Sequence, residues 1–246
     1  MFKKVRIFFI QQFIEINERF LFNIFLLNFY KSKFKKTGLN TFIDVGANLG
    51  QTIDIVLKVN PKCKIIAFEP NPTLYEKLTK KYSALDHIHL YPFAVSNENG
   101  KKEFYENVLH STSTLEELNF SSHYLIKKSM MLGVSPQEII KKTYSVEVVK
   151  LSSFLETNYP NEKIDIIKID TEGHEYYCLK GLFEKSSTHV QCLQLENRND
   201  DMYKNNKSVS EIKNLLNVNN FHLIKEIKHG FGGINELFFE NTNAKN

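Results

Sequence analysis

Apolar residues recur at helical spacing through the first part of the chain. Between Phe2 and about Phe34 they follow the period of an amphipathic helix, and they become denser from Leu21 to Phe29. Thr37-Gly38-Leu39-Asn40 then interrupts the pattern with residues typical of a break. The sequence therefore predicts one or two helices that form an N-terminal extension over residues 1–36.

After this break, short apolar runs rich in β-branched residues alternate with longer amphipathic stretches. This alternation is typical of βα units that build a parallel sheet with helices on both faces. The predicted strands are Thr41–Val45, Lys64–Phe68, Ile88–Tyr91, Ile164–Ile169, Val190–Leu195, Phe221–Ile227 and Glu236–Phe239. The predicted helices are Gly50–Val59, Thr73–Tyr82, His174–Glu184 and Val209–Val218.

Two stretches depart from this rhythm. The final strand follows its predecessor too closely for a helical crossover, so we expect a turn at Gly230, Gly232 and Gly233 and an antiparallel last strand. The predicted fold is thus a Rossmann-like α/β domain over residues 37–246, with a seven-stranded, mostly parallel sheet. Earlier in the chain, polar strands at Lys102–Tyr105 and Tyr144–Leu151 flank a helical stretch, Leu115–Lys142, which Gly133 and Pro136 interrupt. We interpret residues 115–143 as an insertion on the substrate side of the sheet.

Charge is distributed unevenly along the 246 residues. Residues 1–36 hold eight Lys or Arg and two Glu, a balance of +6, whereas the rest of the chain carries −2. A nearly neutral main domain gives no electrostatic basis for binding nucleic acid. No stretch has the roughly 20 uncharged apolar residues of a membrane span. Cys63, Cys178 and Cys192 lack the spacing of a zinc site or disulfide framework, so we expect a cytoplasmic protein with reduced thiols.

The first predicted strand runs directly into the loop Gly46-Ala47-Asn48-Leu49-Gly50 and then into a helix. The two glycines permit a sharp turn and close approach to a ligand, and the helix start offers free N–H groups. Asp44, at the end of the strand, would repel a pyrophosphate but would favour the cationic methionine portion of S-adenosylmethionine. The loop also lacks the GxGxxG pattern of dinucleotide binders.

Two later strand ends add to this cofactor pattern. Glu69 follows the second strand, where a carboxylate can accept both ribose hydroxyls, and Pro70 and Asn71 lead into the next helix. Ala94 and Val95 follow the third strand, where small apolar side chains suit an adenine. Each feature alone has an ordinary structural explanation, such as a cap, a surface ion pair or a turn. Their occurrence together at three adjacent strand ends predicts an S-adenosylmethionine site.

These motifs resemble the FkbM family of methyltransferases over roughly Thr41 to Phe239. The matching segments are Asp-Val-Gly-Ala-Asn-Leu-Gly (44–50), Phe-Glu-Pro-Asn (68–71), Ala-Val (94–95), Ile-Lys-Ile-Asp-Thr-Glu-Gly-His-Glu (167–175) and Leu-Lys-Gly (179–181). The resemblance implies methyl transfer to oxygen, often on sugars, glycans or polyketide-derived hydroxyls. The N-terminal helices and the insertion have no counterpart in it, so the identity of the substrate does not carry over.

A cluster of ionisable residues marks the expected catalytic corner. Asp170 ends an apolar strand, and Glu172, His174 and Glu175 follow within five residues. Charged groups at a buried strand end are costly unless they are paired, coordinated or used. Lys168, two residues before Asp170, is expected to contact a carboxylate of the site, or to form a simple structural ion pair.

Two mechanisms are open for this corner. Asp170, Glu196 and Asn197 offer three oxygen ligands for Mg²⁺ or Mn²⁺, an arrangement analogous to that of catechol-type O-methyltransferases. In the metal-free alternative, His174 takes the proton of the acceptor hydroxyl as general base. His110 is a second candidate base, although a surface position explains it equally simply.

The sequence thus predicts an O-methyltransferase acting on a sugar, either a nucleotide-activated sugar or a glycan. The alternatives are an O-methyltransferase of another small-molecule hydroxyl, a non-catalytic scaffold that keeps the fold, an NAD-dependent oxidoreductase, and a nucleic-acid methyltransferase. The last lacks a base-flipping motif as well as a basic domain. The basic N-terminal helices could rest on an anionic membrane, but their Phe and Leu density favours a homo-oligomer interface.

Overall fold

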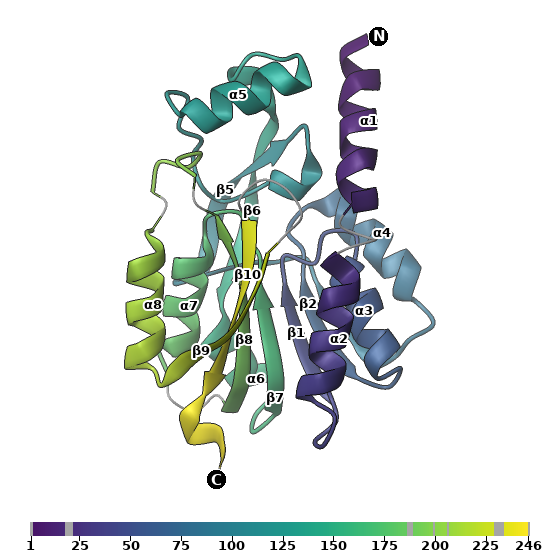
Figure 1. Ribbon diagram of the computed structural model, residues 1–246, viewed down its shortest axis with the longest axis vertical. Helices are drawn as coiled ribbons and strands as arrows, with labels where there is room; N and C mark the ends of the chain where they lie inside the picture. Colours follow the sequence, from purple (N-terminus) through teal and green to yellow (C-terminus); the bar gives the residue numbers. More distant parts are fainter. Residues whose placement is uncertain are drawn as a thin grey trace.

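A seven-stranded sheet forms the centre of the molecule (Figure 1). The computed structural model describes residues 2–17, 22–185, 189–198, 200–205, 207–228 and 234–245. The strands lie in the order β3 (Ile88–Tyr91), β2 (Lys64–Phe68), β1 (Thr41–Val45), β7 (Lys163–Ile169), β8 (His189–Arg198), β10 (Ile234–Asn241) and β9 (Phe221–Lys228). Only β10 runs antiparallel to its neighbours, so the predicted fold class is confirmed. The glycine turn predicted at residues 230–233 lies outside the described residues.

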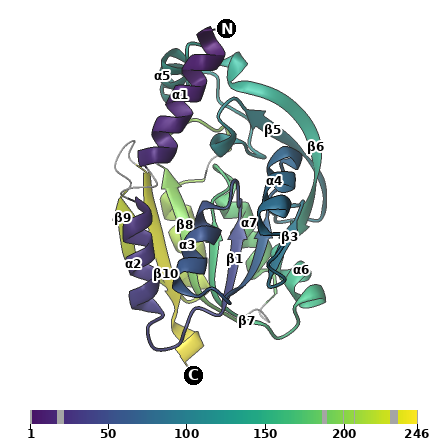
Figure 2. The same ribbon diagram turned by 90° about the vertical axis from the view of Figure 1, so that its right-hand side faces the viewer.

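Helices cover both faces of this sheet (Figure 2). One face packs against α2 (Asn23–Lys33), α3 (Gln51–Val59) and α4 (Pro72–Tyr82), and the other against α6 (Leu151–Asn158), α7 (Glu175–Phe183) and α8 (Val209–Val218). The alternation of side chains along β1 divides its residues between the two cores. Phe42 joins the cluster that contains Leu26 of α2, whereas Ile43 joins the cluster that contains Leu179 of α7.

The N-terminal segment forms the two predicted helices, and they make different contacts. Leu26 and Tyr30 of α2 are fully buried against the central sheet. α1 (Phe2–Asn17) instead extends beyond the sheet and contacts the insertion, where Lys3 Nζ lies 3.1 Å from a carboxylate oxygen of Glu138. Deleting the whole segment would therefore remove part of the main core.

A second sheet of three strands accompanies the insertion. It has the order β4 (Ala94–Ser96), β6 (Ile140–Lys150) and β5 (Gly100–Asn107), with β5 and β6 antiparallel. The predicted polar strands thus exist, but they are longer than expected. β6 begins at Ile140, inside the stretch predicted to be helical, because it pairs with the whole length of β5. It ends at Lys150 rather than Leu151, which is the first residue of α6.

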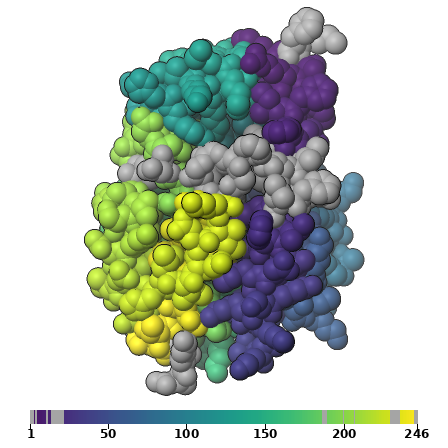
Figure 3. Space-filling model, viewed as in Figure 1, coloured from purple at the N-terminus to yellow at the C-terminus, as the bar shows by residue number. Residues whose placement is uncertain are grey.

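Only part of the stretch Leu115–Lys142 is helical, so the prediction was wrong at both ends. The helix α5 (His123–Leu132) begins after its cap Ser122 and ends at Gly133, which adopts a left-handed conformation with a φ of 72°. Short 3-10 turns occur at His110–Thr112, Gln137–Ile139 and Thr242–Lys245. α5 packs next to α1 at one end of the molecule (Figure 3), beyond the carboxyl ends of the central strands (Figure 1).

In the described part of the chain, no helix combines the length and the apolar character that crossing a membrane requires.

Candidate active site

The loop between β1 and α3 turns sharply because two of its glycines adopt left-handed backbone conformations. Gly46 has a φ of 85°, and a Cβ atom there would lie 2.0 Å from the carbonyl oxygen of Asp170. Gly50, with a φ of 78°, leaves no room for a Cβ beside the Tyr82 hydroxyl. The backbone amides of Gly46 and Ala47 both donate to the carbonyl of Phe68. The loop therefore packs closely against the ends of β2 and β7.

Glu69 fastens this loop to the start of α4. One carboxylate oxygen accepts from the backbone N–H of Asn48 at 2.7 Å, and the other accepts from that of Asn71 at 2.9 Å. Asn71 in turn caps α4 by accepting from the N–H groups of Thr73 and Leu74. Burial raises the pKa of Glu69 to about 7, against the opposing effect of the two backbone hydrogen bonds.

Asp44 and Lys168 lie side by side on β1 and β7 beneath the loop. Asp44 is fully buried, and its carboxylate lies 3.5 Å from the Lys168 Nζ. That Nζ also donates to Asp170 Oδ2 at 3.0 Å. Burial raises the pKa of Asp44, while Lys168 opposes the shift. Burial by itself would lower the pKa of Lys168, but Asp170 and Asp44 raise it above its ordinary value.

A cavity of about 620 Å³ opens at the carboxyl ends of β1, β7 and β8, beside the loop. A smaller cavity of about 60 Å³ adjoins it and is lined by the predicted cofactor residues Glu69, Pro70, Ala94 and Val95. The residues shared by the two cavities are Gly46, Asn48, Ser111, Asp170 and Glu172. The predicted cofactor loop and the predicted catalytic corner thus meet where the two cavities adjoin.

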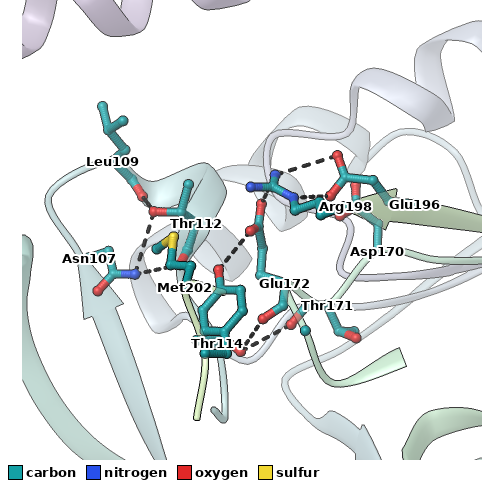
Figure 4. Close-up of polar contacts among 12 residues, drawn as sticks. Asn107, Leu109, Thr112, Thr114, Asp170, Thr171, Glu172, Glu196, Arg198 and Met202 are labelled. Carbon is teal, nitrogen blue, oxygen red and sulfur yellow. Dashed lines mark hydrogen bonds and ion pairs between the residues drawn. The ribbon is translucent and has the colours of Figure 1, made fainter. Parts of the chain in front are cut away.

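The floor of the larger cavity is a network of charged side chains (Figure 4). Arg198 donates from Nη2 to Glu172 at 2.5 Å and from Nε to Glu196 at 2.6 Å. The Tyr203 hydroxyl donates to the second oxygen of Glu172 at 2.8 Å. Burial raises the pKa of both Glu172 and Glu196, although Arg198 opposes the shift in each case. Glu172 and Glu196 can be ionised although they are buried, because each carboxylate pairs with the Arg198 guanidinium.

The turn that carries Glu172 is also fixed by its backbone. Glu172 has a φ of 57°, and the carbonyls of Thr171 and Glu172 both accept from the Thr114 hydroxyl, at 3.1 and 2.8 Å. Gly173 follows with a φ of 94°, and a Cβ there would collide with the Tyr203 ring. This turn therefore aims Glu172 at Arg198.

The predicted metal ligands are only partly brought together. Carboxylate oxygens of Asp170, Glu172 and Glu196 lie within 4.8 Å of one another. Asn197 follows Glu196 directly in β8, so its side chain points to the opposite face of the sheet. Glu172 takes the place in the cluster that was expected for Asn197.

His174 lies outside both cavities. Its Nε2 is 2.9 Å from the Ser96 hydroxyl and its Nδ1 is 2.6 Å from a Glu116 oxygen, and the side chain is buried. Both ring nitrogens are therefore engaged in joining α7 to β4 and the insertion, which does not fit the predicted role of general base. His110, in the 3-10 turn before Ser111, is not among the residues that line either cavity.

Several residues of the cavity were missed by the sequence analysis. They are Arg198 at the end of β8, Glu236 in β10 and Lys128 in α5. Tyr203, which lines neither cavity but donates to Glu172, was missed as well. Glu236 offered a signal, since it is an acidic residue at the start of a predicted apolar strand. The others depend on contacts between distant segments, which the local pattern does not reveal.

Comparisons with known proteins agree with this geometry. The family model described as the methyltransferase FkbM domain matches residues 44–223. The methyltransferase sdnD of Sordaria araneosa is 31% identical over 160 residues, which cover 59% of this chain and 62% of sdnD. The 2-O-methyltransferase NoeI of Sinorhizobium fredii (strain NBRC 101917 / NGR234) is 23% identical over 202 residues, with 81% of this chain and 79% of NoeI covered.

Among solved structures, magnesium protoporphyrin IX methyltransferase (ChlM) from Synechocystis PCC 6803, with bound SAM, superposes with a TM-score of 0.49. The sequence identity is 8%, and the match covers 89% of this chain and 76% of that one.

Proposed function

Because the chain belongs to the methyltransferase FkbM domain family, we propose that it transfers a methyl group from S-adenosylmethionine to a hydroxyl oxygen of a sugar. The observation that carries this proposal is the pair of adjoining cavities: both are lined by the 46–50 loop and by Asp170, and the smaller one is also lined by Glu69. Similarity to a 2-O-methyltransferase supports oxygen as the acceptor atom. A nucleotide-activated sugar or a glycan is the expected acceptor, and another small-molecule hydroxyl is the alternative.

The residues around the smaller cavity fit S-adenosylmethionine. The backbone of Gly46 lines the cavity without a side chain, and the side-chain oxygen of Asn48 is buried without a hydrogen-bond donor. Glu69 keeps lone pairs for ribose hydroxyls, since each oxygen accepts one backbone N–H. Ala94 and Val95 offer an apolar wall for the adenine. Asp44 acts through Lys168 rather than by direct contact, because it lines neither cavity.

Asp170 is the residue to which we assign the proton transfer. It lines both cavities, so an acceptor hydroxyl in the larger one can approach it beside the cofactor. Bound S-adenosylmethionine would supply an electrophilic methyl group. The acceptor oxygen would bond to the methyl carbon as the methyl–sulfur bond breaks and S-adenosylhomocysteine is released, and the hydroxyl proton would pass to a carboxylate oxygen of Asp170. Lys168, 3.0 Å away, holds that carboxylate in place. Much of the rate would come from positioning the two reactants in line.

The three floor carboxylates fit a divalent cation poorly. Arg198 already pairs with Glu172 and Glu196, and Lys168 pairs with Asp170. A Mg²⁺ or Mn²⁺ ion would have to displace or repel these cationic groups. We therefore propose that transfer proceeds without a metal, and that Glu172 and Glu196 orient the acceptor through its hydroxyl groups.

A radiolabel-transfer assay tests the function directly. The protein would be offered neutral sugars, sugar nucleotides and glycans with labelled S-adenosylmethionine, with and without a chelator. We expect transfer that survives the chelator, and a loss of roughly a hundredfold or more in Asp170→Asn. Glu117→Gln, which removes an exposed carboxylate paired with Lys204, is the matched control. Near-normal transfer in Asp170→Asn would refute the assignment, and cofactor binding without transfer to any acceptor would favour the scaffold alternative.

We also propose that residues 115–143 cover the acceptor and that the exposed face of α1 mediates self-association. The first proposal rests on α5, which contributes four residues to the wall of the larger cavity. The second rests on Phe8, Phe9 and Phe13, whose side chains are largely exposed.

A further inference from the structure

One face of α5 forms the roof of the larger cavity. Its lining residues are Tyr124, Lys127, Lys128 and Met131, which have the i, i+3, i+4, i+7 spacing of a single helical stripe. An adjacent stripe of α5, including Leu125 and Leu132, is buried in a separate cluster under the insertion. This packing fixes the orientation of α5 about its own axis. Lys127 and Lys128 are therefore held at the wall of the cavity.

The opposite side of the cavity has the opposite charge. Its floor holds the carboxylates of Asp170, Glu172, Glu196 and Glu236. The cations of that floor, Lys168 and Arg198, lie within ion-pair distance of floor carboxylates. The cavity therefore has an acidic floor beside the cofactor loop, where carboxylates outnumber cations, and a basic roof.

The two roof lysines differ from the other cations of the site. Within the described ranges, neither has a carboxylate oxygen within 4.0 Å of its Nζ. Lys128 Nζ lies 3.6 Å from the sulfur of Met202 and 5.8 Å from the centre of the Tyr124 ring, both weak partners for an ammonium group. Burial, followed by repulsion from Arg198, lowers the pKa of Lys128 to about 8, although Glu172, Asp200 and Glu196 oppose the shift. An anionic ligand bound next to Lys128 would stabilise the charged form of its ammonium group.

We propose that Lys127 and Lys128 form an anion subsite for the acceptor, which is a sugar that carries a phosphate or a carboxylate group. The anionic group binds under α5, and the sugar hydroxyl reaches down to Asp170. This inference rests on the proposed function for the identity of the site, but it concerns a different part of the cavity. The shared chemistry is a compact oxyanion, which suits two adjacent ammonium groups.

Titration calorimetry with three small probes tests the subsite. Glucose 1-phosphate and glucuronate supply the two oxyanions, and methyl glucoside is the neutral reference. In the protein loaded with S-adenosylhomocysteine, we expect at least one anionic probe to bind more tightly than the neutral one. The double variant Lys127→Gln with Lys128→Gln should weaken anionic binding about tenfold or more, since charge-assisted hydrogen bonds are lost. Binding of methyl glucoside should not change.

Two further variants make the result specific. Lys77→Gln with Lys80→Gln removes the same charge from the exposed surface of α4 and should leave probe binding unchanged. Lys127→Arg with Lys128→Arg keeps the charge and should restore most of the affinity. The probe that binds identifies phosphate or carboxylate as the preferred group.

The subsite is refuted if the wild type shows no preference for anionic probes, or if the α4 variant loses as much affinity as the α5 variant. Binding of S-adenosylhomocysteine is measured separately in every variant. Failure of that binding in the wild type would count against the proposed function, whereas normal cofactor binding without anion preference would count against the subsite alone.

Discussion

Glu69 is the residue on which the cofactor side of the site depends most directly. Its carboxylate joins the 46–50 loop to the start of α4, so it sets the position of the loop as well as offering oxygens to a ribose. It is also nearly buried, with 6% of its surface exposed. The charged form of this carboxyl is therefore costly, and its protonation state becomes sensitive to pH near neutrality.

A pH profile of cofactor binding follows from this position. Burial raises the folded-state pKa of Glu69 from 4.5 to about 7, so the carboxyl is largely protonated at pH 6 and ionised at pH 8. Because the ionised form accepts hydrogen bonds from the loop and the ribose, we expect the Kd for S-adenosylhomocysteine to fall about tenfold over this range. By the same linkage, Glu69 contributes less to folding stability as the pH rises from about 4.5 to 7.

Calorimetry on Glu69→Gln separates this effect from titration of the ligand itself. The variant should bind more weakly and lose the part of the pH dependence that belongs to Glu69. Glu76→Gln, an exposed change on α4, should keep the wild-type profile. An unchanged profile in Glu69→Gln would show that another group is responsible.

At the residue scale, the sequence predicted which residues gather around the smaller cavity better than it predicted those around the larger one. Gly46, Glu69 and Ala94 come after the neighbouring strands β1, β2 and β3. The local pattern and the order of the strands were therefore enough to predict that these residues lie close together. Arg198 was missed because the strand was expected to end at Leu195. The polar residues after Leu195 suggested a loop, but pairing with β10 extends β8 as far as Arg198. Glu116, which engages His174, lies 58 positions away from it in the chain.

The link between Arg198 and Glu172 connects two elements, the end of β8 and the turn between β7 and α7. With 13% of the Arg198 side chain exposed and 6% of Glu172, this ion pair is shielded from solvent. Removing one partner from such a pair leaves an uncompensated buried charge. We expect Arg198→Met to lower the free energy of unfolding by roughly 3–5 kcal/mol, measured by urea denaturation.

Two comparisons give this prediction its control. Lys204→Met breaks the pair with Glu117, in which both side chains are more than half exposed, and should cost about 1 kcal/mol or less. Adding Glu172→Gln to Arg198→Met should recover part of the lost stability, because it removes the stranded charge. Equal losses in Arg198→Met and Lys204→Met would contradict the role assigned to the buried pair.

At the scale of helices and strands, the alternation of short apolar runs with amphipathic stretches predicted the central sheet but not the structure of the insertion. The central strands β1, β2 and β7 are short apolar runs between clear breaks, so the local sequence identifies them. The helix α6 was missed because it follows β6 at once, and its preceding residue, Lys150, makes no side-chain cap. The early start of β6 depends on its partner β5, and an exposed antiparallel pair has no strong hydrophobic signature.

At the scale of the whole molecule, the N-terminal segment divides between two roles. α2 completes the core of the main sheet, where Leu26 and Tyr30 are buried. α1 packs one side against the insertion through Ile7 and Ile10, and leaves Phe8, Phe9 and Phe13 between 59% and 65% exposed. An aromatic surface of this kind on a helix next to the acceptor side is typical of an interface.

Substitution of the three phenylalanines tests self-association more cleanly than deletion of the extension, because deletion would also remove the buried residues of α2. We expect the wild type to show a multiple of the single-chain mass by light scattering, and the triple variant Phe8→Gln, Phe9→Gln, Phe13→Gln to show the single-chain mass. Within a single chain these side chains face solvent, so the triple variant should keep the wild-type fold by circular dichroism. Val218→Gln with Leu223→Gln removes exposed apolar surface elsewhere and should keep the wild-type mass. A single-chain mass for the wild type, or an unchanged mass for the triple variant, would exclude this face as the interface and leave its aromatic residues to a different partner.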